Sequence, residues 1–152
     1  MTAVRIPFET APGARDALRG VEKYLAQCGL PRELLELVKL RVSLLNGCAY
    51  CVDLHWNKLK ALGESEQRLY SVSVWREQTG YSPRERAALA WAESLTRVAE
   101  TGVPDSAFAE VSAHFTPKEI ADLSYAVAVI NAWNRLCVAF RIPPEHGMAE
   151  RP

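Results

Sequence analysis

The chain has no excess of either charge, since Lys plus Arg and Asp plus Glu both number 18 in 152 residues. No basic stripe or tail is present that would neutralise a row of phosphates, so we expect no nucleic-acid partner. Cysteine is scarce, and four residues are too few for a disulfide-rich scaffold. With 49% hydrophobic and 24% charged residues, the composition excludes intrinsic disorder and predicts a single globular domain over residues 1–152.

Signals for export and for membrane insertion are also lacking. Residues 1–10 have no basic start followed by an apolar run, so we expect a cytoplasmic protein without a secretory signal. The most apolar stretch, residues 120–140, is long enough to span a bilayer but is interrupted by polar residues that are costly in hydrocarbon. These are Asp122, Asn131, Asn134 and Arg135. We therefore expect no membrane contact but a buried core helix, whose polar groups bond another helix, another subunit or the rim of the active site.

Alternating, β-branched segments typical of exposed strands are missing, and we predict an all-α fold. Glycine, proline and capping residues divide the chain into about seven helices. We expect them at about 13–28, 31–46, 48–63, 65–78, 82–100, a short one from 104–105, and 116–140. The two helices that meet at Gly47 are linked so tightly that they must fold into an antiparallel hairpin. Residues 141–152 are expected to form an irregular tail.

Three side chains with redox and acid–base chemistry follow Gly47. Cys48, Cys51 and His55 occupy positions i, i+3 and i+7 of the third expected helix, on one face. Cα atoms three residues apart in a helix are roughly 5 Å apart, which permits a disulfide between the two cysteines. The positive end of the helix dipole favours the thiolate, which is the species that attacks peroxides and disulfides. Histidine, with an ordinary pKa of about 6.5, is suited to accept the thiol proton.

Glu36 is the candidate residue that orients His55. It lies 11 residues before Gly47, and His55 lies 8 residues after it. At 1.5 Å per residue these separations are about 16 Å and about 12 Å along antiparallel helices, so the two side chains fall within one turn of each other. The apolar neighbours Leu35 and Leu37 predict that the carboxylate is partly buried.

This pattern resembles the AhpD-like alkylhydroperoxidases of the carboxymuconolactone decarboxylase superfamily, which are marked by a glutamate followed by C-x-x-C-x-x-x-H. The matching residues are Glu36, Cys48, Cys51 and His55. Segments 39–47 and 85–96 are similar to members with a single copy of the motif, and the motif core spans about 31–100. The resemblance implies an all-helical subunit that assembles into trimers or hexamers and reduces organic hydroperoxides or hydrogen peroxide.

The resemblance also implies residue roles. Cys51 corresponds to the peroxidatic thiol and Cys48 to the resolving thiol, which a dithiol or lipoyl-type electron donor later attacks. We expect Cys48, at the tip of its helix, to be the more accessible of the two, which suits this exchange. His55 and Glu36 correspond to a water-assisted proton relay, and no metal or bound cofactor is implied. The sequence departs from the best-known members at Tyr50, where they carry a histidine, and in having one motif copy.

Other interpretations of the cysteine motif remain open at the level of sequence. A structural zinc site needs a fourth ligand, which no second ligand pair supplies. A thioredoxin-like fold needs a strand before the motif. A non-catalytic redox sensor, or a partner protein of an oxidoreductase, would switch the same pair between dithiol and disulfide without turnover. Lactone decarboxylation is less expected, because that branch of the superfamily lacks the cysteine pair. The remaining cysteines, Cys28 and Cys137, are expected to be small buried hydrophobic residues.

Overall fold

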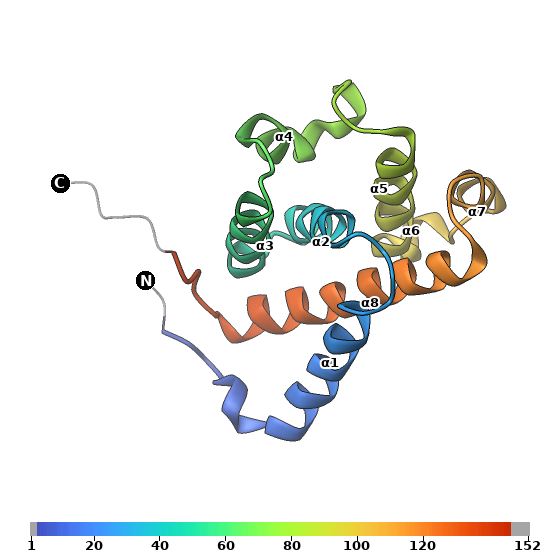
Figure 1. Cartoon of the computed structure of the whole chain (residues 1–152). Coiled ribbons are helices and arrows are strands. Elements are labelled where there is room, and N and C mark those ends of the chain that lie inside the picture. Colours follow the sequence, from blue (N-terminus) through green and yellow to red (C-terminus); the bar gives the residue numbers. More distant parts are fainter. Residues whose placement is uncertain (1–2, 147–152) are drawn as a thin grey trace.

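The computed structural model describes residues 3–146, which contain eight α-helices, two 3-10 helices and no strand (Figure 1). The α-helices are α1 (Pro12–Leu25), α2 (Arg32–Asn46), α3 (Ala49–Ala61), α4 (Glu66–Ser71), α5 (Pro83–Thr96), α6 (Val98–Thr101), α7 (Asp105–Ser112) and α8 (Pro117–Phe140). The 3-10 helices are η1 (Phe8–Thr10) and η2 (Val72–Glu77). The all-α prediction is confirmed.

Two of the seven expected helices are interrupted. In the helix expected at 65–78, the Arg68 carbonyl accepts bonds from the Tyr81 hydroxyl (2.6 Å) and the Ser71 hydroxyl (3.1 Å), and the α-helix gives way to η2. In the helix expected at 82–100, the Ser94 carbonyl accepts the Thr101 hydroxyl (2.9 Å), and α5 ends before α6 begins. Hydroxyl groups that compete for helix carbonyls therefore explain why the sequence pattern predicts too few, longer helices.

The helix α2 lies at the centre, with α3, α5 and α8 packed around it (Figure 1). Every residue from Leu34 to Leu40 is buried, including Glu36 and Lys39. A helix that is covered on all sides forces its polar side chains to find partners inside the protein. The side chains of Glu36 and Lys39 are consequently held in fixed positions, where their charges act on the groups beside them.

The predicted antiparallel hairpin of α2 and α3 is present. Gly47 ends α2 in the left-handed conformation (φ 66°), which favours glycine, and Cys48 is the N-cap of α3. The Cys48 N–H donates to the Ser43 carbonyl (3.1 Å), which closes the end of α2. This short connection holds the cysteine motif against the central helix.

The long helix α8 begins at a capping box formed by Thr116 and Glu119 and runs beneath α2 (Figure 1). By length and composition alone it could cross a membrane, but one of its faces packs against α1, α2 and α5. Its Asn131 and Asn134 both accept bonds from the Asn46 amide of α2, at 3.0 and 2.9 Å. Of the three expected partners for these polar groups, the structure therefore shows another helix.

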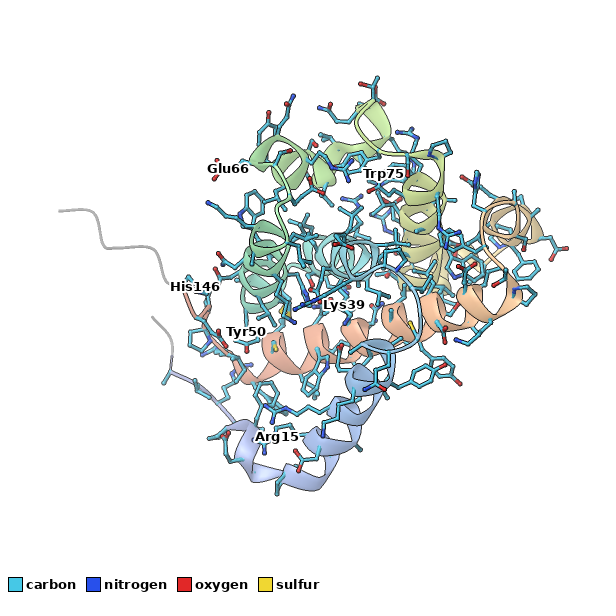
Figure 2. All side chains as sticks on the ribbon, in the orientation of Figure 1. Arg15, Lys39, Tyr50, Glu66, Trp75 and His146 are labelled. Carbon is cyan, nitrogen blue, oxygen red and sulfur yellow. A yellow bond between two sulfur atoms is a disulfide. The ribbon has the colours of Figure 1, made fainter. Side chains whose placement is uncertain are left out.

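Residues 141–146 are irregular, as expected, and the rest of the predicted tail, 147–152, lies outside the described residues. This segment lies along α3, where Glu145 accepts the Tyr50 hydroxyl (3.0 Å) and the His146 N–H donates to Asp53 (3.1 Å) (Figure 2). The segment thus covers one side of the cysteine motif. The single domain over 1–152 stays a prediction.

Candidate active site

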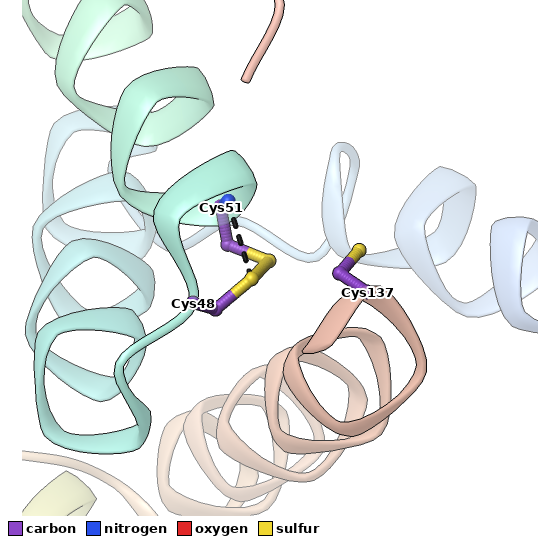
Figure 3. Close-up of side chains that lie close together, drawn as sticks. All are labelled: Cys48, Cys51 and Cys137. Atoms are coloured by element: carbon purple, nitrogen blue, oxygen red, sulfur yellow. Dashed lines mark hydrogen bonds between the residues drawn. A yellow bond between two sulfur atoms is a disulfide. The ribbon is translucent and has the colours of Figure 1, made fainter. Parts of the chain in front are cut away.

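Cys48 and Cys51 form a disulfide at the start of α3, with their Cα atoms 5.3 Å apart (Figure 3). Cys48 is the N-cap, and its sulfur accepts the Cys51 N–H at 3.3 Å. A disulfide between these two cysteines, which their spacing at the start of a helix permits, is therefore confirmed. The same N–H group and the helix dipole stabilise negative charge on Cys48 when the pair is reduced.

His55 and Glu36 are joined as the helix arithmetic predicts. Nδ1 of His55, on α3, is 2.6 Å from Oε2 of Glu36, on α2, and the two residues are only 3% and 6% exposed. Because an ionised carboxylate can only accept, the proton sits on Nδ1 and the ring keeps Nε2 as its free acceptor. The arrangement fixes one tautomer of the imidazole.

Burial and charge set the ionisation of this pair. Burial alone raises the pKa of Glu36, but the hydrogen bond from His55 and the positive charges of Lys58 and Lys39 bring it below its ordinary value. Burial lowers the pKa of His55, which the contact with Glu36 only partly offsets. At neutral pH the site therefore holds a neutral imidazole beside a carboxylate, and this is the state required of a general base.

Two lysines and a glutamate extend the pair into a larger charged group. Lys58 Nζ lies 3.7 Å from the second oxygen of Glu36, and the buried Lys39 is bonded to Glu22 of α1. None of these three residues was predicted from the sequence as part of the site. Lys58 has a usable signal, since it is one turn beyond His55, whereas Glu22 is placed only by the packing of α1.

A cavity of about 250 Å³ opens beside the motif, between α1, α3 and α8. Cys51 and His55 both line it. The other lining residues are Phe8, Arg15, Arg19, Glu22, Tyr50, Leu54, Lys58, Ile130, Trp133 and Cys137. Its walls combine aromatic and aliphatic surface with basic groups from α1 and α3, so a small organic molecule can contact Cys51 there.

The accessibility expected of Cys48 is wrong. Cys48 is 1% exposed and Cys51 is 2% exposed, and of the two only Cys51 lines the cavity. The cause is tertiary packing, because Cys48 belongs to a buried core cluster that includes residues of α2 and α8. The tip of a helix is accessible only where no other element covers it.

Cys137 of α8 is a third sulfur at this site (Figure 3). The Sγ atoms of Cys48, Cys51 and Cys137 all lie within 4.8 Å of one another. Cys137 is buried, as expected, and burial raises its pKa to about 11. Cys28, by contrast, is partly exposed, which corrects the expectation that both isolated cysteines are buried.

Tyr50, between the two cysteines, lines the cavity and donates its hydroxyl to Glu145. Burial and this bond to a carboxylate raise the pKa of Tyr50 to about 12. The phenol therefore stays protonated at neutral pH and cannot serve as the base that a histidine at this position would provide. Of Tyr50 and His55, which both line the cavity, only His55 can accept a proton at neutral pH.

Comparison with known proteins finds a matching family model and a similar protein. The model of the carboxymuconolactone decarboxylase family matches residues 10–94, more than half of the chain. The uncharacterized protein YdfG of Bacillus subtilis (strain 168) is 39% identical over 132 residues, which are 87% of this chain and 90% of YdfG.

Two solved structures share the architecture. A protein of unknown function from Agrobacterium tumefaciens, with a proposed role as the antioxidant defence protein AhpD, is 42% identical with a TM-score of 0.92, covering 95% of this chain and 100% of its own. The alkylhydroperoxidase AhpD core of a peroxidase-related protein from Ralstonia eutropha JMP134 is 23% identical with a TM-score of 0.74, covering 90% and 75%.

Proposed function

Because this chain belongs to the carboxymuconolactone decarboxylase family, and within it to the AhpD-like proteins, we propose that it is a thiol-dependent hydroperoxide reductase. The observation that carries the proposal is the placement of Cys51 and a neutral His55 on the wall of one cavity, with His55 held by Glu36. A nucleophile and a base then line one cavity that accepts a small organic molecule, and a carboxylate orients the base.

The first step oxidises Cys51. His55 Nε2 accepts the thiol proton, directly or through water, and the ionised Glu36 stabilises the resulting imidazolium. The thiolate sulfur attacks the terminal oxygen of the hydroperoxide, so that an S–O bond forms while the O–O bond breaks. The departing alkoxide takes the proton from His55, and the products are an alcohol and a Cys51 sulfenic acid.

The second step forms the disulfide. The Cys48 sulfur attacks the Cys51 sulfur, an S–S bond replaces the S–O bond, and hydroxide leaves as water with the proton from Cys48. Two thiols have then supplied two electrons to the peroxide. The Cys48–Cys51 disulfide of this structure supports the proposal because it is the product of this step.

An external dithiol, of lipoyl type in our proposal, returns the pair to the reduced state. Its thiolate attacks one sulfur of the disulfide, and its second thiol then displaces the protein. Since Cys48 is covered in this structure, attack on Cys48 requires the first turn of α3 to open, whereas Cys51 is already reachable from the cavity. We place the reaction in the cytoplasm, where thiols are kept reduced, and assign it no resident cofactor.

The proposal is tested by peroxide consumption under excess dithiol, with hydrogen peroxide and cumene hydroperoxide compared. We expect sustained turnover with a higher kcat/KM for the organic peroxide, because aromatic and aliphatic side chains line the cavity. Cys51→Ser should reduce turnover to background, and His55→Ala should reduce it by about 10²-fold or more. Cys28→Ser is the matched control, since Cys28 lies outside the site, and it should retain wild-type activity.

Two outcomes would contradict the proposal. Full activity in Cys51→Ser would remove the assigned nucleophile. Oxidation of the wild type by one equivalent of peroxide, without further consumption in the presence of several dithiols, would instead identify a redox sensor that switches state stoichiometrically.

A further inference from the structure

A two-cysteine peroxidase cycle leaves Cys137 without a task. Its sulfur nevertheless lies within 4.8 Å of both sulfurs of the pair, and the three residues are 1%, 2% and 3% exposed (Figure 3). They come from two elements far apart in the sequence, the start of α3 and the last turns of α8. Three buried thiols that converge in this way make a set of soft ligands once the disulfide is reduced.

We propose that the reduced protein binds one Cu(I) ion through the sulfurs of Cys48, Cys51 and Cys137. A metal bonded at about 2.3 Å to three sulfurs in a plane holds them about 4 Å apart. The present spacing, with every sulfur within 4.8 Å of the others, meets this requirement after the Cys48–Cys51 bond opens and the sulfurs shift by less than an atomic diameter.

The donor set favours Cu(I) over Zn²⁺. Structural zinc is held by four ligands, and within the part of the chain that the structure describes no imidazole or carboxylate joins the three sulfurs. His55 also lines the cavity, but its ring nitrogens are not among the atoms that lie within 4.8 Å of all three sulfurs. Thiolates select Cu(I), which is satisfied by three of them, so the site is complete without a further side chain.

The charge balance of binding follows from the thiol chemistry. Copper enters as Cu(I), so no electron is transferred, and each thiol that binds as a thiolate releases one proton to solvent. The N–H of Cys51 and the positive end of α3 stabilise the charge on Cys48. Cys137 is buried beside the pair, and the metal displaces its thiol proton on binding.

Copper binding does not depend on the proposed peroxidase activity, but it acts on the same sulfurs. A bound ion holds Cys48 and Cys51 apart and occupies the nucleophile, so the metal-loaded chain can neither react with peroxide nor close the disulfide. The fold would then couple copper load to the loss of thiol reactivity.

The test is an anaerobic titration of the fully reduced chain with Cu(I), in competition with the chelator bathocuproine disulfonate. We expect one Cu(I) per chain for the wild type and for Cys28→Ser, and no comparable binding by the disulfide form. Cys137→Ser should bind Cu(I) at least about tenfold more weakly. Loss of a residue that only hydrogen-bonds a metal ligand already lowers metal affinity by about 10-fold or more, and loss of the ligand itself should cost more. Equal affinity in Cys137→Ser would overturn the proposal.

X-ray absorption on the copper-loaded wild type keeps the proposal testable even if a Cys137 variant folds poorly. Three sulfur neighbours in the first shell of copper support the site, and two sulfurs in a linear arrangement overturn it. Peroxide turnover of the metal-free protein is measured in parallel, so a failure of copper binding and a failure of the peroxidase proposal are read out separately.

Discussion

At the scale of single residues, His55 owes its chemistry to what surrounds it on two helices. Burial keeps its imidazole neutral, Glu36 fixes its tautomer, and Lys58 and Lys39 oppose its protonation by their positive charge. None of these contacts is unusual on its own. Together they make a base that is oriented toward the cavity and available at neutral pH.

Glu36→Gln should lower kcat/KM for an organic hydroperoxide by about 10-fold to 100-fold, because a neutral amide cannot stabilise the imidazolium of His55. Loss of the negative neighbour also lowers the pKa of His55 further, so the acidic limb of the pH profile should move to lower pH. The measurement is kcat/KM across pH. Glu33→Gln, on the exposed start of the same helix, is the control and should change neither quantity. An unmoved acidic limb in Glu36→Gln would argue against the relay.

The same burial predicts how stability depends on pH. Between about pH 6.5 and the lower pKa of native His55, the unfolded chain binds a proton that the native chain does not, so the free energy of unfolding falls as pH decreases. The lowered pKa of Glu36 adds a further loss in more acidic solution.

Urea unfolding of the disulfide form at pH 7.5 and 5.5 measures this dependence. We expect lower stability at pH 5.5 and a smaller difference between the two values in His55→Asn. His114→Asn, which alters an exposed histidine, should keep the wild-type difference. Equal stability of the wild type at both values would contradict the assignment of a buried neutral imidazole.

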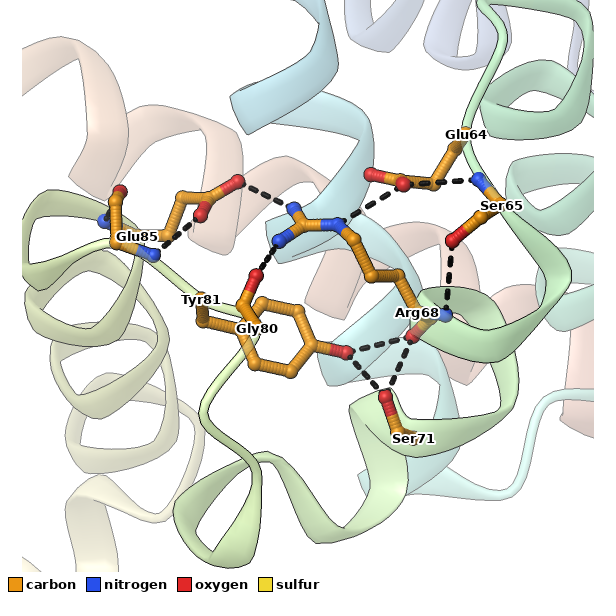
Figure 4. Close-up of polar contacts among 8 residues, drawn as sticks. Glu64, Ser65, Arg68, Ser71, Gly80, Tyr81 and Glu85 are labelled. Carbon is orange, nitrogen blue, oxygen red and sulfur yellow. Dashed lines mark hydrogen bonds and ion pairs between the residues drawn. The ribbon is translucent and has the colours of Figure 1, made fainter.

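At the scale of secondary-structure elements, Arg68 joins α4 to the start of α5 (Figure 4). Its guanidinium donates to Glu64 (2.9 Å), Glu85 (2.6 Å) and the Gly80 carbonyl, and it lies 4.6 Å from the ring centre of the buried Tyr81. Glu85 also closes the capping box of α5. One side chain therefore holds together the segment in which the expected fourth helix is interrupted.

Arg68→Met should lower the free energy of unfolding by about 1–3 kcal/mol, because the half-buried carboxylates Glu64 and Glu85 lose a charged donor. Chemical denaturation measures the change, with the exposed Arg97→Met as control. Peroxide turnover should be unaffected, since none of these residues lines the cavity. A free energy of unfolding equal to that of the control would show that the bonds from Arg68 to Glu64 and Glu85 do not stabilise the fold.

At the scale of the whole molecule, one face of α8 is exposed although the helix is strongly apolar. Tyr125 is 60% exposed and lies on a groove of about 520 Å³ between α5, α6 and α8, with Leu95, Val98 and Ala128 beside it. The family resemblance implies a homo-oligomer, and we propose that a second copy of the chain covers this face.

Tyr125→Glu should reduce the mass found by sedimentation equilibrium, because a carboxylate would be buried at the contact between copies. Tyr70→Glu is the matched control: Tyr70 is also 60% exposed but belongs to α4, and its change should leave the mass unaltered. A wild-type chain that sediments as a monomer would rule out self-association through this groove.

Interactions within neighbouring elements were predictable from the sequence. The turn at Gly47 fixes α2 and α3 as antiparallel neighbours, so the constant helix rise was enough to pair Glu36 with His55. The capping boxes that begin α5 (Ser82 and Glu85) and α8 (Thr116 and Glu119) likewise act within a single turn. In each case the information lies in a few residues close together in the chain.

Only the tertiary structure decided what lies around this hairpin. Cys137 reaches the cysteine pair, and Glu22 reaches Lys39, because α8 and α1 pack against the central helix at a particular rotation and depth. Periodicity indicates which face of a helix is apolar but not which partner covers it or in what register. The sequence alone therefore determined the all-α class, the hairpin of α2 and α3 and the pairing of Glu36 with His55. Packing determined the burial of Cys48, the cavity and the third sulfur.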